Sequence, residues 1–323
     1  MIYINDLNAI RIEEDTVLTI GKFDGLHMGH KKLLDEVRKK QKEGLRSAIF
    51  TFDIPPQNEI THTKGKILTT NDEKHFIFKE AGIDYFIECP FTEEIRNLEA
   101  EDFIRLVVEK FRVKCFVVGT DCHFGHNRSG DYELLRKYAA QYGYDVIVVE
   151  KKQYEGRDIS STFIREEIEK GNIEKANLLL GYPYFIKGIV QTGNRIGNTI
   201  GFPTVNQIPE GDKLLPPYGV YAAQIVIGDR CYQGVSNIGV KPTIKGHNVC
   251  GVETNIFDFN EDVYGKEIYV RLFHFIRSER KFDSLEELKA MIAKNSEEAA
   301  EILSAYKQSP ILLDPVSEDM ILA

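Results

Sequence analysis

The first half of the chain alternates short β-rich runs with segments of helical period. Runs rich in β-branched and aromatic residues occupy positions 17–21, 47–53, 85–89, 114–119 and 145–150. Apolar residues recur at three- and four-residue spacing between them, at 29–42, 72–81, 100–111 and 132–142. This order predicts a doubly wound α/β domain, in which helices cover a parallel sheet. Ligands of such sheets bind at the carboxyl ends of the strands, so we expect the chemistry in the loops after Gly21, Phe52 and Gly119.

The pattern changes after a helical segment at 161–180. Gly181, Tyr182 and Pro183 are followed by short strand patterns separated by Gly and Pro turns. These patterns predict an antiparallel sheet or a small closed barrel and lie at 184–191, 219–228, 230–239, 251–259 and 266–276. A helix predicted at 285–306 would pack on the sheet. The sequence thus predicts two domains, at 1–182 and 183–306, followed by a tail at 307–323.

Charge and composition limit the expected partners and location. The 323 residues include 41 Lys and Arg against 50 Asp and Glu, a formal net charge of −9, so we expect no nucleic acid partner. No apolar run approaches the roughly 18 residues that a membrane span needs, so we expect no membrane insertion. Acidic residues within positions 1–20 disfavour a secretory signal, and the five cysteines form no CxxC pair. These features are typical of a cytoplasmic protein.

The loop after the first strand has the properties of an anion site. Residues 21–30 read GKFDGLHMGH and run directly into a helix. His27 and His30 flank Gly29 at the helix N-terminus, where free backbone N–H groups and the helix dipole favour a phosphate. The glycine allows close backbone approach, and the imidazoles can donate to charge that develops on a phosphoryl group. The alternative is that both histidines only cap the helix.

Two further polar motifs follow later in the first half. Residues 159–165 read ISSTFIR at the start of a helix, where hydroxyl groups and an arginine favour a phosphate or simply form a helix cap. The polar, glycine-rich loop at 119–131 follows a buried strand and is expected at the carboxyl edge of the sheet. It contains Cys122, His123 and His126, but zinc is disfavoured because an adjacent Cys and His cannot easily chelate one ion.

With HxGH at 27–30, GxD at 119–121 and ISSTxIR at 159–165, the first half resembles the HxGH nucleotidylyltransferases. It is most similar to the FMN adenylyltransferase part of bacterial FAD synthetases. The resemblance implies transfer of AMP from ATP to FMN, with release of pyrophosphate, and catalytic roles for His27 and His30. The residues that it implies in binding ATP or its phosphates are Gly21, Phe23, Asp24, Gly29, Gly119, Asp121, Ser161, Thr162 and Arg165.

The second half offers a different set of candidate residues. Gly193 and Gly197 belong to the glycine-rich segment GIVQTGNRIGNTIGFPTVN, which could wrap around ATP phosphates although the chain has no Walker A motif. Thr204 and Asn206 are two residues apart, so their oxygens lie on one side of an extended segment and suit Mg²⁺ with ATP. Glu253 lies among strand formers and is a candidate general base. The alternative is an exposed glutamate beside a glycine-rich hairpin.

The order GNRIGNTIGFPTVN, LLPPYGVYAA, GVSNIGVKPTI, VETNIFDF and VYGKEIYVRLFHFIRSERKF resembles the riboflavin kinase domain over its whole length. The resemblance implies a six-stranded barrel in which Thr204 and Asn206 bind Mg²⁺ with ATP. It also implies that Glu253 deprotonates the 5′-hydroxyl of riboflavin, with Arg277 on the flavin side. We therefore expect the chain to convert riboflavin to FMN and FMN to FAD, with ATP as the second substrate of both steps.

Two other functions stay open at this point. One is a kinase whose adenylyltransferase half is weakened; the other is a flavin-sensing regulator, which the intact HxGH motif and the acidic charge disfavour. The histidine that relatives usually carry shortly after the position of Phe52 is missing, and His123 stands where an arginine is common. Arginine is always cationic, whereas histidine side chains are mostly neutral above pH 7. We therefore expect slower adenylyl transfer than phosphorylation near neutral pH, with FMN accumulating before FAD.

Overall fold

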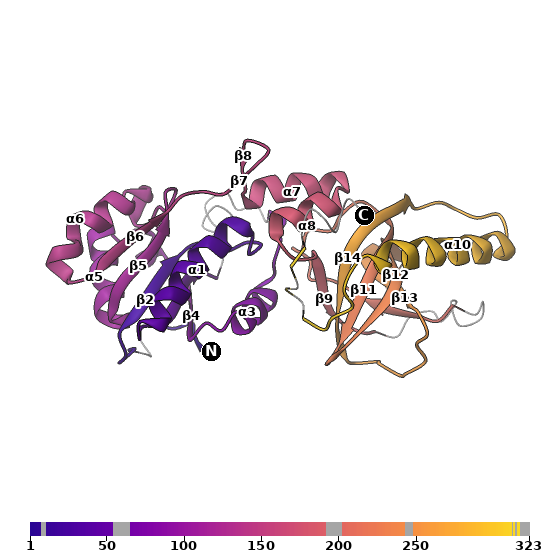
Figure 1. Cartoon of the computed structure of the whole chain (residues 1–323), viewed down its shortest axis with the longest axis horizontal. Helices are drawn as coiled ribbons and strands as arrows, with labels where there is room; N and C mark the ends of the chain where they lie inside the picture. The colour runs from indigo at the N-terminus through magenta and orange to yellow at the C-terminus, as the bar shows by residue number, and fades with distance from the viewer. Residues whose placement is uncertain are drawn as a thin grey trace. The chain divides into compact units, whose positions relative to one another are not determined.

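The computed structural model describes residues 1–7, 11–53, 65–191, 202–242, 248–311, 313, 315 and 316. The chain divides into two compact units, Met1–Ser160 and Ser161–Ala323 (Figure 1). The sequence analysis places the domain boundary after Tyr182, whereas the second unit begins with helices α7 (Ser161–Lys170) and α8 (Ile173–Leu180). They belong to this unit because α8 packs against its strand β14 (Glu267–Ser278). The boundary between the two functions stays a prediction.

The first unit contains a parallel six-stranded sheet. Its strands lie in the order β1-β4-β3-β2-β5-β6, and every neighbouring pair is parallel. They are β1 (Ile2–Ile4), β2 (Thr16–Ile20), β3 (Arg46–Phe52), β4 (Tyr85–Cys89), β5 (Val113–Gly119) and β6 (Asp145–Val149). This confirms the predicted α/β fold. The short edge strand β1 was not predicted, because three residues are too few to show a period.

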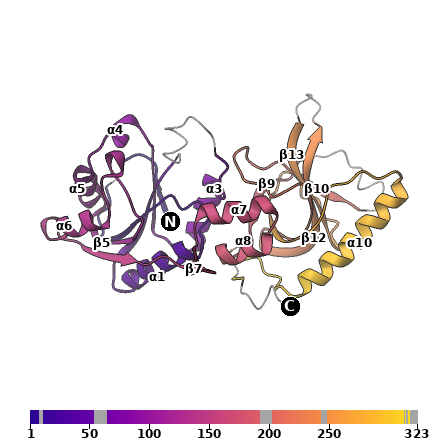
Figure 2. The same cartoon turned by 90° about the horizontal axis from the view of Figure 1, so that it is seen from above.

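Helices connect these strands and cover the sheet (Figure 2). They are α1 (Met28–Lys42), α3 (Asn71–Glu80), α4 (Glu93–Arg96), α5 (Ala100–Phe111) and α6 (Tyr132–Tyr142), with the short 3₁₀ turn His126–Arg128 before α6. Between α6 and the second unit, β7 (Gln153–Tyr154) and β8 (Arg157–Asp158) form a small hairpin. A capping box of Thr70 and Glu73 begins α3. The apolar side of α5 packs with Phe50, Ile87 and Phe116 of the strands in one buried cluster, so the helical period of the sequence predicted a core face.

The second unit contains an antiparallel six-stranded sheet. Its order is β10-β13-β12-β11-β14-β9, and an isolated bridge links Gln191, two residues after the edge strand β9, to Asn206 of the other edge strand. This closure confirms the predicted barrel architecture. The remaining strands are β9 (Phe185–Ile189), β10 (Thr204–Gln207), β11 (Gly219–Ile227), β12 (Arg230–Pro242) and β13 (Asn248–Ile256). Helix α10 (Leu285–Ser304) covers Val220 and Ala222 with its residues Ala299 and Leu303.

The start of the C-terminal tail is bound to the barrel through a buried arginine. Arg271 is 1% exposed and donates to the carbonyl oxygens of Ser309, at 2.7 Å, and of Ile311, at 2.8 Å. The side chain of Gln224 donates to the carbonyl oxygen of Lys307 at 3.2 Å. Main-chain carbonyls thus solvate part of a buried charge, which stabilises residues 307–311 against the strands.

Candidate active sites

The loop at 21–30 ends in two stacked imidazoles. His27 is the N-cap of α1, and its Nδ1 accepts a hydrogen bond from the backbone N–H of His30 at 3.4 Å. The two ring centroids lie 3.7 Å apart, with 21° between the ring planes. Because its Nδ1 is an acceptor, a neutral His27 carries its proton on Nε2, which can donate to a ligand. The Nδ1 of His30 lies 3.2 Å from the carbonyl oxygen of Gly25, so this nitrogen carries the proton of His30.

Burial keeps both imidazoles neutral. Desolvation lowers the pKa of His27 well below its ordinary value, and the nearby His30 lowers it further. Desolvation also lowers the pKa of His30 to about 4, against the opposing effects of Gly25, Asp121 and Asp24. His27 and His30 are therefore hydrogen-bonding groups at pH 7 and not permanent cations.

Hydrogen bonds and a buried ring fix the shape of this loop. The carboxylate of Asp24 accepts from the backbone N–H groups of Leu68, at 2.8 Å, and Thr69, at 3.0 Å. Phe23 is buried with a φ of 48°, and a Cβ added to Gly21 would lie 3.1 Å from its ring. These contacts hold the loop in place. The predicted contribution of Gly21, Phe23 and Asp24 to ATP binding stays a prediction.

The GxD motif lies at the carboxyl end of β5 and within electrostatic range of His30. A Cβ added to Gly119 would lie 2.9 Å from Oδ1 of Asp121, so glycine allows this carboxylate to fold back. Oδ2 of Asp121 pairs with Lys151 at 3.3 Å, and Lys151 also pairs with Asp158 at 3.3 Å. The structure thus brings together the first two motifs. Lys151 was missed, because a lysine in a surface-like run carries no local signal.

The third motif begins beside Gly29. A Cβ added to Gly29 would lie 3.1 Å from the His27 ring and 3.6 Å from the carbonyl oxygen of Ile159, the first residue of ISSTFIR. Ser161, Thr162 and Arg165 lie in the first turns of α7 and belong to the second unit. Their place at a helix start agrees with the sequence pattern, whereas their phosphate-binding role stays a prediction.

The Cys and His side chains of the 119–131 loop face separate partners. The Nδ1 of His123 lies 2.9 Å from the carbonyl oxygen of Asp121, and that of His126 lies 3.4 Å from Glu99. Cys122 is buried, which raises its thiol pKa to about 12. Within the described part of the chain, no three His, Cys, Asp or Glu side chains are grouped closely enough to hold a metal ion.

In the second unit, the candidate base Glu253 belongs to a row of residues that lie opposite one another on neighbouring strands. Asn206 pairs with Glu253, Glu253 with Asn237, Asn237 with Val220, and Val220 with Arg277. Directly opposed residues of antiparallel strands share a face of the sheet, so this outer row runs across five strands on one face. Val220 packs against α10, which places the row on the outside of the barrel.

Both ends of the outer row are fixed by neighbouring side chains. The hydroxyl of Thr204 donates to Oε1 of Glu253 at 2.6 Å. At the other end, Nε of Arg277 donates to the side-chain oxygen of Asn295 on α10 at 3.3 Å, and its guanidinium lies 5.6 Å from the Phe282 ring. With neighbouring strands about 4.8 Å apart, three spacings separate Glu253 from Arg277 by roughly 14 Å. The structure therefore brings together Thr204, Asn206 and Glu253 and keeps Arg277 apart from them.

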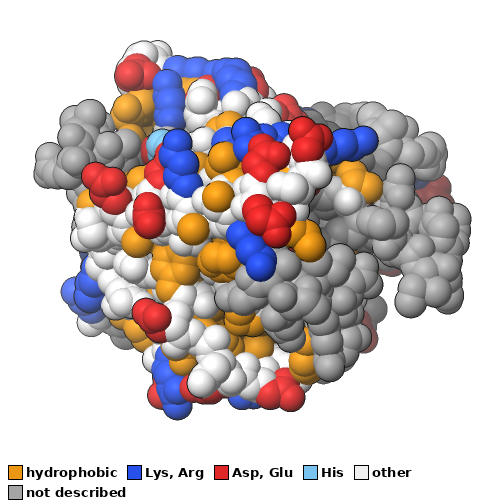
Figure 3. Space-filling model, turned by 90° about the vertical axis from the view of Figure 1, so that its right-hand side faces the viewer, with side chains coloured by type: hydrophobic (Ala, Val, Ile, Leu, Met, Phe, Trp, Pro, Cys, Tyr) orange, Lys and Arg blue, Asp and Glu red, His pale blue; other side chains and the backbone are white. Residues whose placement is uncertain are grey.

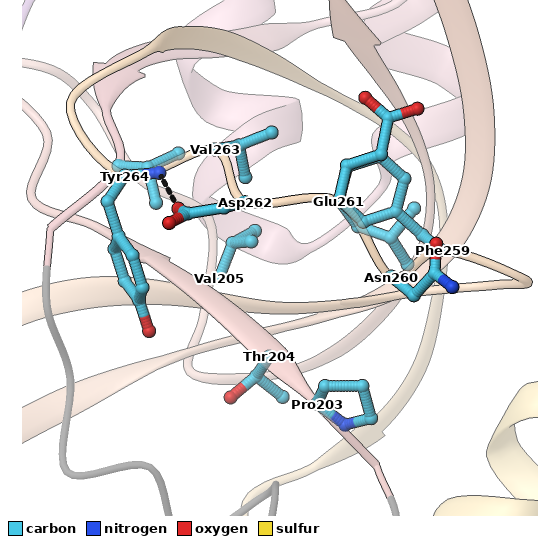
Figure 4. A pocket seen from close by; sticks show the side chains of 11 residues that line it. Pro203, Thr204, Val205, Phe259, Asn260, Glu261, Asp262, Val263 and Tyr264 are labelled. Atoms are coloured by element: carbon cyan, nitrogen blue, oxygen red, sulfur yellow. Dashed lines mark hydrogen bonds between the residues drawn. The ribbon is translucent and has the colours of Figure 1, made fainter.

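A hollow of about 330 Å³ adjoins Thr204 (Figure 4). In Figure 4, Pro203 and Thr204 lie below the loop that carries Asp262 and Tyr264. Within this loop, the backbone N–H of Tyr264 donates to the carboxylate of Asp262 at 3.0 Å. The lining combines apolar and polar side chains and consists of Val190, Pro203, Thr204, Val205, Ile256, Phe259, Asn260, Glu261, Asp262, Val263 and Tyr264. The sequence analysis missed the 259–264 loop because it matches no motif. Gly193 and Gly197, predicted to bind phosphates, lie outside the described residues.

Comparisons with known proteins agree with both halves of this arrangement. The family model of FAD synthetase matches residues 9–163, and that of riboflavin kinase matches residues 180–303. The bifunctional riboflavin kinase/FMN adenylyltransferase of Escherichia coli is 38% identical over 299 residues, which cover 91% of this chain and 95% of that protein. The chain belongs to this bifunctional family. The member from Bacillus subtilis is 35% identical and covers 91% of this chain and 94% of its own.

A solved structure matches nearly the whole chain. A Streptococcus pneumoniae protein described as a macrolide-efflux protein is 31% identical, with a TM-score of 0.82, and the match covers 93% of this chain and 98% of that one. The bifunctional family thus confirms the two enzyme halves predicted from the sequence motifs.

In the part of the chain that the structure describes, no helix is both long and apolar enough to cross a membrane.

Proposed function

We propose that the chain makes FAD in two steps. The second unit transfers the γ-phosphoryl group of ATP to the 5′-hydroxyl of riboflavin, which gives FMN and ADP. The HxGH site then transfers AMP from a second ATP to FMN, which gives FAD and pyrophosphate. The observation that carries this proposal is the outer row, in which a carboxylate held by Thr204 shares a sheet face with Asn206 and Arg277, in a chain of the bifunctional family.

In the kinase step, Glu253 acts as the general base. Its Oε1 accepts a hydrogen bond from the Thr204 hydroxyl at 2.6 Å, which orients the carboxylate that takes the proton of the flavin hydroxyl. Proton removal by a positioned carboxylate accelerates such reactions by about 10²- to 10⁴-fold. We place ATP in the hollow beside Thr204, whose lining combines apolar and polar side chains.

The oxygens beside Glu253 fit a magnesium ion. Thr204 offers a hydroxyl and Asn206 an amide oxygen on the sheet face of Glu253, and oxygen is the ligand that Mg²⁺ prefers. Thr204 and Asn206 would hold the ion together with ATP. When bound, it neutralises negative charge on the phosphates of the nucleotide.

In the adenylyl transfer step, a phosphate oxygen of FMN attacks the α-phosphorus of ATP, and the bond to pyrophosphate breaks. The Nε2–H of His27 donates to the phosphoryl oxygens, where negative charge increases in the transition state. His30 supports this geometry through its backbone N–H and its stacked ring. Asp121 helps hold the nucleotide, and Ser161, Thr162 and Arg165 bind its phosphates.

The same proposal includes a cytoplasmic location and no nucleic acid partner. The net charge of −9 supports the absence of a nucleic acid partner. On the face of the molecule in Figure 3, acidic and basic side chains are interspersed among apolar ones, which differs from the continuous basic surface that nucleic acid binding requires.

Chromatography of a reaction tests this proposal directly. Purified protein is incubated with riboflavin, ATP and Mg²⁺, and riboflavin, FMN and FAD are separated over time. We expect FMN first and FAD later. FMN without FAD would indicate a weakened adenylyltransferase half. Neither product, together with tight and salt-dependent nucleic acid binding, would indicate the regulator instead.

A further inference from the structure

Two paired glycines lie next to Glu253 in the sheet. Gly239 of β12 pairs with Gly251 of β13, two positions along from the pair of Asn237 and Glu253. Residues two apart on a strand point to the same face, so the two glycines lie on the face of the outer row. Both positions lack a side chain on the sheet face that carries Glu253.

The carboxylate of Glu279 lies over Gly239. A Cβ added to Gly239 would overlap the carboxylate of Glu279, so position 239 accepts no side chain while Glu279 keeps its place. The side-chain N–H of Asn237 donates to Oε1 of Glu279 at 3.4 Å. Glu279 follows the end of β14, two residues after Arg277. Because β12 lies between β13 and β14 in the sheet, this second carboxylate stands on the path from Glu253 to Arg277.

The chemistry of the substrate suggests what this carboxylate does. When the 5′-hydroxyl of riboflavin is at Glu253, the other hydroxyls of its ribityl chain come next along the chain toward the ring. A carboxylate has two oxygens and about four acceptor positions, and the long bond from Asn237 occupies one of them. Glu279 is also solvent-exposed, so a ligand can reach the remaining acceptor positions.

We propose that Glu279 is a specificity-determining residue of the kinase step, whose carboxylate accepts hydrogen bonds from the ribityl hydroxyls of riboflavin on the sheet face that carries Glu253. This inference rests on the proposed kinase function, because it takes Glu253 as the base. In this proposal Glu279 binds the hydroxyls along the ribityl chain, whereas Glu253 reacts with the hydroxyl at its end.

Kinase kinetics of the full chain test this assignment with two flavins. Riboflavin is the substrate, and lumiflavin, which has the same ring without hydroxyls, is a competitive inhibitor of the same site. In Glu279→Ala we expect the KM for riboflavin to rise about tenfold, because hydrogen bonds to a charged group are lost, while the Ki of lumiflavin stays unchanged. Gly239→Ala keeps the carboxylate but displaces it, so it should raise the KM in the same way. Glu301→Gln, on the exposed side of α10, is the matched control.

Two outcomes would overturn the assignment. An unchanged KM for riboflavin in Glu279→Ala would show that the carboxylate does not contact the substrate. Equal rises in KM and in the lumiflavin Ki would show that Glu279 only shapes the ring site. Glu253→Gln is assayed in parallel: retained turnover in that variant would refute the proposed kinase site itself, whereas lost turnover there with normal kinetics in Glu279→Ala would refute the present inference alone.

Discussion

At Glu253, a single carboxylate carries the proposed proton transfer. Glu253→Gln preserves the size of the side chain and a bond with Thr204 but removes the base. We expect kinase turnover to fall by about 10²- to 10⁴-fold, while conversion of added FMN to FAD continues, because that step uses the other unit. Separate chromatographic assays started from riboflavin and from FMN measure both rates. Equal losses in the two assays would contradict the assignment.

His27 combines a structural and a chemical role that one variant can separate. Asparagine is a good N-cap residue but has no group equivalent to the Nε2–H of His27. In His27→Asn we therefore expect an unchanged melting temperature and kinase rate, with adenylyl transfer reduced by about 10²- to 10³-fold. An unaffected rate of FAD formation would mean that His27 only caps α1.

Because His30 is neutral in the folded chain, the stability of the protein should depend on pH under acidic conditions. Its pKa is about 4 in the folded chain against an ordinary value of 6.5. Between these values the unfolded chain binds more protons, so stability falls as the pH drops from 6.5 toward 4. His30→Gln removes this contribution, and its urea midpoint should fall less than that of the wild type when the pH is lowered from about 7 to about 5. Parallel losses in both proteins would contradict the burial argument.

The loop between β5 and α6 contains a departure from the family pattern. The exposed ring of His123 is bonded to the carbonyl oxygen of Asp121, at 2.9 Å. If this ring takes the place of an arginine against phosphate, the site lacks the two-pronged contact that a guanidinium makes with phosphate. The His123→Arg variant should then lower the KM of adenylyl transfer and leave the kinase rate unchanged, as measured by chromatography of reactions started from FMN and from riboflavin. An unchanged KM in the variant would show that His123 has no such contact.

The elements that the sequence predicted are those long enough to show a period. Helices α1, α3, α5 and α6 begin within one residue of their predicted positions, whereas β1, β10 and α4 have three or four residues and show no pattern. The two-residue separation of Thr204 and Asn206 placed them on one side of an extended segment, although no pattern marked β10 as a strand. The pairing of Glu253 with Asn237, and of Val220 with Arg277, depends on contacts far apart in sequence. The place of Glu279 over Gly239 is of the same kind, so no local pattern could predict either.

For the whole molecule, the order of the motifs predicted the two enzyme halves, but the division between them is a matter of packing. The segment 161–182 follows the HxGH half in sequence and carries Ser161, Thr162 and Arg165, yet it packs with the barrel. Asn177 of α8 is 2% exposed; it donates to the carbonyl oxygen of Leu272 at 2.9 Å and accepts from the backbone N–H of Tyr184 at 2.7 Å. One segment therefore has a predicted part in the first reaction and a structural part in the second unit.

Two fragments test this division. Fragment 161–323 retains α7 and α8 and should fold cooperatively and phosphorylate riboflavin. Fragment 183–323 loses the fully buried side chains of Ile173, Leu179 and Leu180 and both bonds of Asn177. Losses of about 2–5 kcal/mol for each such apolar side chain exceed the stability of a typical domain, so we expect this fragment to be unfolded by circular dichroism and inactive. The matched point variant is Asn177→Ala in the full chain, which should lower the melting temperature without changing the KM for riboflavin. A folded, active 183–323 would instead place the boundary after Tyr182, and α8 would then be dispensable to the barrel.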